Sequence, residues 1–321
     1  MLASDTSPVA FSLRNGVQES VHHGAVVCLE RDGSIAFSAG SPQAIIFPRS
    51  STKPFLATAM VAAGLKLPSK LLALVCASHD GRPEHLQAAR EILLGAGLDE
   101  NALCNTKDFP LDDEAAHELV RVGGIKTSLQ MNCSGKHSGM LATCVNCGWA
   151  HDETYLDQDH NLQLCITKLM PELIGEEVAN IVVDGCGAPA HAMTLAGLAR
   201  GFRAVAMSNI GSPAREVADA MRMHPQMVGG PTRDVTLLMS GISGLVAKDG
   251  AEGVYAAALP DGRAVALKIA DGANRARPPL MRAALIALGI DISGVDERAF
   301  ASPIFGHEQI VGEVRVVDNL L

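Results

Sequence analysis

The chain has 321 residues, of which 48% are hydrophobic and 3% aromatic, and its formal net charge is −9. This composition is too apolar for a disordered chain and can fill a buried core. The negative charge and the lack of a basic run argue against binding to nucleic acid or an anionic membrane. Because no apolar run is long enough to span a membrane and the amino terminus lacks a secretory pattern, we expect a cytoplasmic protein.

Short apolar runs predict strands at both ends of the chain. Two pairs of runs flank turn sequences and predict β-hairpins: residues 24–30 and 34–39 around Arg31-Asp32-Gly33, and residues 253–259 and 264–270 around Pro260-Asp261-Gly262-Arg263. One further run, residues 313–317, predicts a last strand.

Between these ends the pattern is mostly helical, with proline near helix starts and glycine near helix ends. Clear helices are predicted over residues 53–64, 83–97, 112–124, 154–170, 212–225 and 278–289. The economical arrangement is an α+β fold, in which one antiparallel sheet built from both termini carries packed helices. We expect a single domain over residues 1–321, with a helical insert from about 50 to 240.

Four glycine- or cysteine-rich stretches interrupt the helical pattern, and their composition suits loops in which the backbone approaches a ligand. They are CASHDG (76–81), MNCSGKHSGML (131–141), DGCGAPA (184–190) and GISGLVAKDGAEGVY (241–255). An apolar helix is expected from about residue 140. Of the eleven histidines, His79 and His137 stand out because they lie in these loops.

A further stretch, RSSTKPF (49–55), contains Ser50 and Lys53 in an S-x-x-K pattern. Three residues apart on a helix, a hydroxyl and an amine lie on the same face. Serine becomes a nucleophile when a base removes its proton, and lysine can be that base when burial or a nearby cation lowers its pKa. The pattern also occurs by chance, and Ser50 or Ser51 can equally serve as a helix N-cap.

The eight cysteines are scattered through apolar or glycine-rich contexts, which favours free thiols or metal ligands over a disulfide framework. Cys133 is a candidate zinc ligand, and Cys186 is the natural second one because it also lies in a tight glycine loop. Their separation along the chain does not show that they meet, so two buried free cysteines are the alternative. Cys144 and Cys147 lie within an expected helix and are interpreted as core packing.

In their order along the chain, RSSTKPF, CASHDG, NCSGKHSGML, DGCGAPA and LVAKDGA resemble the L-asparaginase II family of the Rhizobium etli type, also called class 3. The resemblance extends over about residues 20–320. It implies a fold like that of serine β-lactamases, penicillin-binding proteins and some glutaminases. It also implies hydrolysis of L-asparagine to L-aspartate and ammonia by a homodimer.

The resemblance implies roles for the residues that match the family's motifs. These are the catalytic pairs Ser50–Lys53 and Ser78–Lys248, the zinc ligands Cys133, Lys136 and Cys186, and the substrate-site residues Arg49, Asp184 and His137. Ser51 and Thr52 would be spacers. Asp234 stands where at least one relative has a cysteine, a difference expected to alter the charge of the pocket.

Two other functions fit the same sequence. One is a glutaminase or β-lactamase-like serine hydrolase, because a shared scaffold and chemistry do not fix the substrate. The other is a non-catalytic zinc-binding protein in which the serines and lysines are structural.

Overall fold

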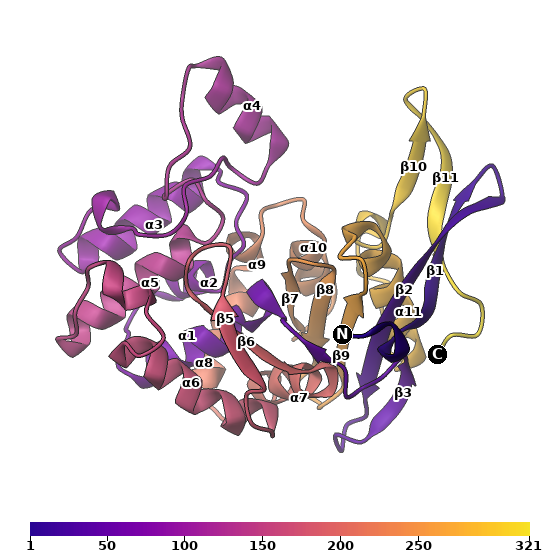
Figure 1. The fold of residues 1–321 in the computed structure, drawn as a ribbon, viewed down its shortest axis with the longest axis horizontal. Helices are drawn as coiled ribbons and strands as arrows, with labels where there is room; N and C mark the ends of the chain where they lie inside the picture. Colours follow the sequence, from indigo (N-terminus) through magenta and orange to yellow (C-terminus); the bar gives the residue numbers. More distant parts are fainter.

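The computed structural model describes residues 1–321 and contains an eight-stranded antiparallel sheet built from both ends of the chain (Figure 1). Its strands are β1 (Ser7–Arg14), β2 (Val17–Leu29), β3 (Ile35–Ala39), β7 (Val246–Gly250), β8 (Val254–Ala258), β9 (Ala264–Ile269), β10 (Pro303–Gly306) and β11 (Gln309–Val316). They follow the order β10-β11-β1-β2-β9-β8-β7, and β3 also pairs with β2. The predicted α+β fold with strands at both termini is confirmed.

Both predicted hairpins are present, as β2–β3 and β8–β9. A third hairpin, β1–β2, was not predicted, and it turns at Asn15 and Gly16, whose φ angles are 48° and 80°. Positive φ at both central positions is typical of the two-residue turns that join twisted strands. The expectation of a loop over residues 241–255 is wrong for β7, which is buried and pairs with β8.

Most of the helices lie between the two groups of strands. They are α1 (Lys53–Ala62), α2 (Ser69–Val75), α3 (Pro83–Gly95), α4 (Asp113–Arg121), α5 (Ser134–Cys147), α6 (Asn161–Ile174), α7 (Leu195–Ala206), α8 (Pro213–Met223), α9 (Pro225–Val228), α10 (Asp234–Gly241) and α11 (Arg277–Ala287). The helix predicted over 154–170 is wrong at its start, because the His160 side chain caps α6 by accepting a hydrogen bond from Leu162 N. Helices α2, α7, α9 and α10 were not predicted.

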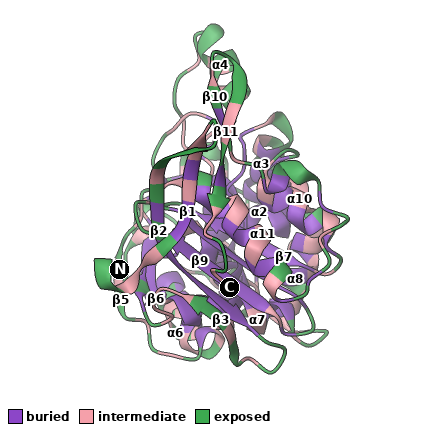
Figure 2. Cartoon of the chain, turned by 90° about the vertical axis from the view of Figure 1, so that its right-hand side faces the viewer, coloured by how far each residue is buried: buried purple, intermediate pink, exposed green.

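One hydrophobic core of 83 buried residues draws on the chain from Val9 to Val314. A second, three-stranded sheet lies beside it and consists of β4 (Ile45–Ile46), β5 (Asn180–Val183) and β6 (Pro189–Thr194). Figure 2 shows the centre of the large sheet buried and helix α4 largely exposed. No helix combines the length and the apolar character that crossing the membrane would require.

Helices α1 and α5 are buried around most of their circumference, and both begin at polar motif residues. Gly135 and Gly139 of α5 face Leu74 and Val75 at the end of α2, where a Cβ atom would come within 2.7 Å of neighbouring atoms. This close packing brings the start of α5 next to the loop that follows α2. The loop expected over 131–141 is therefore helical from Ser134 onward.

Candidate active site

A short 3₁₀ turn, Arg49–Thr52, leads into α1. Arg49 has a φ of 53°, a left-handed conformation that is unfavourable for a side chain other than glycine. Ser51 Oγ donates to the carbonyl of Lys248 on β7 over 3.1 Å, and Thr52 Oγ1 donates to the carbonyl of Arg49 over 2.9 Å. These two residues were expected to be spacers, but Ser51 fastens the turn to the edge of the sheet and Thr52 closes the turn itself, while Ser50 stays partly exposed.

Lys53 is the first residue of α1, and only 2% of it is exposed. Its Nζ donates to the carbonyl of Ala77 over 2.5 Å, and it lies 3.1 Å from Ser78 Oγ and 3.2 Å from Cys133 Sγ. The structure contains no hydrogen bond between Lys53 and Ser50. The amine of the S-x-x-K motif is thus directed at the second serine.

Ser78 lies in the loop after α2, which backbone hydrogen bonds hold in place on two sides. Ser78 N donates to Val228 O over 3.0 Å, and His79 N donates to Asn132 O over 3.1 Å. The His79 ring also shares a 2.8 Å hydrogen bond with Ser134 Oγ at the start of α5. Burial holds the pKa of His79 well below its usual value, so the ring is neutral and supports the loop.

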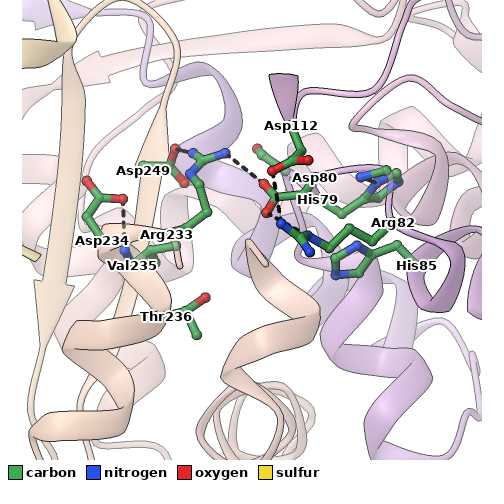
Figure 3. Close-up of polar contacts among 12 residues, drawn as sticks. His79, Asp80, Arg82, His85, Asp112, Arg233, Asp234, Val235, Thr236 and Asp249 are labelled. Atoms are coloured by element: carbon green, nitrogen blue, oxygen red, sulfur yellow. Dashed lines mark hydrogen bonds and ion pairs between the residues drawn. The ribbon is translucent and has the colours of Figure 1, made fainter. Parts of the chain in front are cut away.

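Lys248 approaches Ser78 from β7, with its Nζ 3.0 Å from Ser78 Oγ. Its Nζ also donates to the Asp249 carboxylate, which Arg233 Nη2 contacts over 2.6 Å (Figure 3). Burial lowers the pKa of Lys248 to about 8; Asp249 opposes this shift, and Lys53 adds to it. Burial acts to raise the pKa of Asp249, but Lys248 and Arg233 hold it well below its usual value, so the carboxylate stays ionised.

A cluster of two thiols and a lysine adjoins this set. Lys136 Nζ donates to Cys186 Sγ over 3.0 Å, and the Cys133 and Cys186 thiols interact with each other. The neighbouring Cys133 thiol holds the pKa of Cys186 far below its usual value, whereas Cys186 and burial raise the pKa of Cys133, whose thiol donates to Asn132 Oδ1 over 3.2 Å. No group of three or more His, Cys, Asp or Glu side chains is arranged to hold a metal ion, so a site here needs the lysine amine.

The three residues expected to line the substrate site surround this cluster. Arg49 Nε forms a close ion pair with Asp184, whose Oδ1 also accepts from Gly185 N over 2.7 Å. His137 Nδ1 shares a 2.8 Å hydrogen bond with Tyr155, and its buried Nε2 has no hydrogen-bond partner. Burial lowers the pKa of His137 to about 4, so its ring is neutral.

The remaining cysteines are also unpaired, as expected. Cys144 is fully buried in α5, and Cys147 is partly buried at its end, where its thiol donates to Ala63 O over 3.2 Å. Their interpretation as packing residues agrees with these positions.

A cleft of about 450 Å³ opens onto the serines. Its lining includes Ser50, Ser78, Asn132, Arg233, Asp249 and Arg277. A second cleft, of about 440 Å³, is lined mainly by apolar side chains and by Arg49. None of the candidate catalytic residues Ser50, Lys53, Ser78 and Lys248 lines it. The first cleft is therefore where a substrate can meet the candidate nucleophile.

Sequence reasoning missed three charged residues of this cleft. Asp249 directly follows a motif lysine, and that position was the available signal. Arg233 precedes α10 and Arg277 begins α11, in stretches without a recognisable motif. Asp234, which was expected to alter the pocket, does not line the cleft but lies 3.6 Å from Arg277 Nη2.

Comparisons with solved structures find distant likenesses. Mglu in its native form is 14% identical, and the match covers 82% of this chain and 63% of Mglu with a TM-score of 0.44. A β-lactamase from Mycobacterium bovis is 13% identical, with 83% and 94% of the chains covered and a TM-score of 0.40. A candidate β-lactamase from Bacteroides dorei is 14% identical, with 83% and 93% covered and a TM-score of 0.46.

This chain thus spans less than two thirds of the length of Mglu. TM-scores below 0.5 do not by themselves establish a common fold. The comparison with curated protein sequences gave no match.

The family comparison is decisive, because the model of the L-asparaginase II family matches residues 10–316, nearly the whole chain. The match spans the turn at Ser50, the Ser78 loop, the thiol cluster and β7. The chain therefore belongs to the L-asparaginase II family and is an amidohydrolase by that membership.

Proposed function

We propose that the protein hydrolyses the side-chain amide of L-asparagine to L-aspartate and ammonia. The observation that carries this proposal is the position of the Ser78 hydroxyl, which lies between the amines of Lys53 and Lys248 in a cleft that Ser50 also lines. Membership of the L-asparaginase II family supports the choice of substrate.

Ser50 is assigned as the nucleophile because its hydroxyl makes no hydrogen bond within the protein and faces the cleft. The Ser78 hydroxyl, in contrast, is already engaged by two amines. In the proposed reaction Ser50 attacks the amide carbon and gives up its proton to Lys53, which forms a tetrahedral intermediate. The carbon–nitrogen bond then breaks, and the leaving ammonia takes a proton through Ser78 from Lys248. Water hydrolyses the resulting acyl-enzyme.

The oxyanion of the intermediate needs donors that are not already used. The backbone N–H groups of Ser50 and Ala251 make no hydrogen bond in the protein, and both residues line the cleft. We assign them as the oxyanion site. These two residues lie on the turn before α1 and just after β7.

Zinc is the metal that the family implies, and the thiol cluster fits it chemically. Cys133, Cys186 and Lys136 would hold the ion, because thiolate and nitrogen donors suit zinc and Lys136 Nζ already lies 3.0 Å from Cys186 Sγ. The ion, when bound, would act as a Lewis acid that orients polar groups of the substrate. Because Lys53 Nζ lies 3.2 Å from Cys133 Sγ, the metal site and the serine site would adjoin.

Ammonia release from L-asparagine, L-glutamine and a β-lactam control tests the proposal. We expect the wild type to prefer L-asparagine and Ser50→Ala to lose about 10³-fold or more in kcat while remaining folded. Ser51→Ala is the comparison variant, because it removes a neighbouring hydroxyl that fastens the turn to β7 but does not line the cleft, and it should lose far less activity than Ser50→Ala. Undiminished turnover in Ser50→Ala would exclude the nucleophile, and turnover by neither protein would favour a non-catalytic role.

A further inference from the structure

Arg277 begins α11 and lines the cleft that contains the two serines. Only 6% of the residue is exposed. Its Nη1 donates to Gly250 O over 3.1 Å and to Val254 O over 3.4 Å, and its guanidinium carbon lies 5.5 Å from the centre of the Tyr255 ring. These contacts fix the guanidinium group at the end of β7.

The other edge of this guanidinium group lacks hydrogen-bond partners. Arg277 Nη2 is 3.6 Å from the Asp234 carboxylate, and Nη1 is 3.6 Å from that of Asp249; both are ion-pair contacts that lie beyond hydrogen-bonding distance. Its Nε is buried and has no partner at all. A buried cationic donor left unsatisfied is unfavourable, so a site of this kind favours an anionic ligand that can accept from it.

The other arginines near the serines are already occupied. Arg233 donates to Asp249 over 2.6 Å and also contacts Asp80 (Figure 3). Arg49 is paired closely with Asp184 and lines the separate apolar cleft. Of these three arginines, only Arg277 both lines the cleft that contains Ser50 and has N–H groups without a hydrogen-bond acceptor.

We propose that Arg277 binds the α-carboxylate of the substrate, with Arg233 adding positive potential from the same wall. The ligand class is an amino-acid amide with a free carboxylate. Asp234, which faces Arg277 from the start of α10, would compete with that carboxylate and limit its affinity. This inference rests on the proposed amidohydrolase function, and it adds Arg277 to the substrate-site residues that the sequence suggested.

The test compares L-asparagine with 3-aminopropanamide, which is the same amide without the α-carboxylate. For the wild type we measure the ratio of kcat/KM values for the two substrates. In Arg277→Met this ratio should fall by about 10- to 100-fold, the range expected for a lost charge-assisted hydrogen bond, and Arg277→Lys should restore part of it. Asp234→Asn should raise the ratio by up to about five-fold.

Arg222→Met is the matched control. Arg222 is also a mostly buried arginine that donates to backbone carbonyls, those of Gly244 and Ala206, but it does not line the cleft. Its substitution should leave the ratio unchanged even if stability falls. An unchanged ratio in Arg277→Met, or an equal loss for both substrates, would overturn the carboxylate site.

Calorimetry separates this inference from the proposed function. L-Aspartate, the expected product, should bind to the Ser50→Ala protein and bind at least about 10-fold more weakly once Arg277→Met is added. If the wild type shows no turnover but this difference is found, the reaction is wrong and the carboxylate site stands. If the wild type turns over L-asparagine and the added substitution changes neither binding nor the ratio, the carboxylate site is wrong and the reaction stands.

Discussion

Lys53 Nζ lies 3.1 Å from the hydroxyl of Ser78, whereas no hydrogen bond joins it to Ser50, its neighbour in the S-x-x-K motif. Because Lys248 Nζ lies 3.0 Å from the same hydroxyl, Ser78 connects the two amines. A hydroxyl in this position can accept a proton from one amine while passing its own to the other. The geometry therefore suits Ser78 to proton transfer and leaves Ser50 free to attack.

Ser78→Ala should slow acylation without abolishing it, because the leaving ammonia loses the hydroxyl that relays its proton. We expect kcat to fall by about 10²- to 10⁴-fold, the usual contribution of a positioned proton-transfer group. Any acyl-enzyme that mass spectrometry detects in the quenched reaction should be on Ser50, at a lower level than in the wild type. If the acyl-enzyme is absent in Ser78→Ala but present in Ser50→Ala, then Ser78 is the nucleophile and Ser50 is not.

The close packing of α5 on α2 predicts a stability effect away from the chemistry. A Cβ atom at Gly135 would lie 2.5 Å from Leu74 O, a backbone atom that cannot move aside easily. Gly135→Ala should therefore lower the free energy of unfolding by about 1–3 kcal/mol, as overpacking usually does. Denaturant unfolding measures this.

Gly95→Ala is the control for that substitution. Gly95 ends α3, has nothing within 4 Å of its would-be Cβ and has no left-handed φ. The change should raise the free energy of unfolding by about 0.4–1 kcal/mol, because alanine has less freedom in the unfolded chain. Equal destabilisation by both substitutions would show that the contact with α2 is not the cause.

The fold was largely predictable because local patterns mark strands and helices. The β1–β2 hairpin was not predicted, although Asn15-Gly16 is a sequence typical of a two-residue hairpin turn. Strand β7 was expected to be a loop, because its Asp249 and Gly250 resemble loop residues while tertiary packing buries them. Local propensity does not report such burial.

The site could be predicted only in part, and for a physical reason. Motif resemblance singled out Ser78 and Lys248, which lie 170 residues apart and meet in the structure. The pairing of Lys53 with Ser78 depends on how α1 packs beside the loop after α2, and no spacing rule encodes it. Arg277 reaches the cleft through the position of α11 on the sheet, so its sequence context gave no signal.

The thiol cluster leads to a prediction about zinc content. Cys133→Ser and Cys186→Ser should each lower the zinc bound per chain, measured by elemental analysis after purification with metal present, because serine is a much weaker zinc ligand than cysteinate. Cys147→Ser is the control, since this thiol lies at the far end of α5 and donates its hydrogen bond to Ala63 O. Full zinc content in both site variants would rule out this ligand set.

Zinc binding should also weaken as the pH falls. A lysine must lose its proton to coordinate a metal, and Lys136 carries that requirement here. Competition titrations with a chelator should show affinity falling steadily as the solution is acidified. Lys136→Met should bind zinc more weakly and show a shallower dependence on pH, because it removes the proton that competes with the metal.

The contact between Lys248 and Asp249 predicts how activity depends on pH. Burial lowers the pKa of Lys248 to about 8, and in the proposed reaction this side chain must be protonated to supply the leaving ammonia. Activity should therefore decline as the pH rises through about 8. Asp249 stabilises the ammonium form, so Asp249→Asn should lower the pKa of Lys248 further and move the decline to lower pH.

Profiles of kcat/KM against pH, which report the ionisations of the free enzyme, measure this shift. The nearby cations do not reverse its sign, because Lys53 and Arg233 also act to lower the pKa of Lys248. Asp112→Asn is the control: Asp112 pairs with Arg82 in the neighbouring network but touches neither Lys248 nor Asp249 (Figure 3). For Asp112→Asn, the decline of kcat/KM at alkaline pH should match that of the wild type. A limb that stays in place or moves to higher pH in Asp249→Asn would show that Lys248 does not act as the acid, because removing the carboxylate can only favour its neutral form.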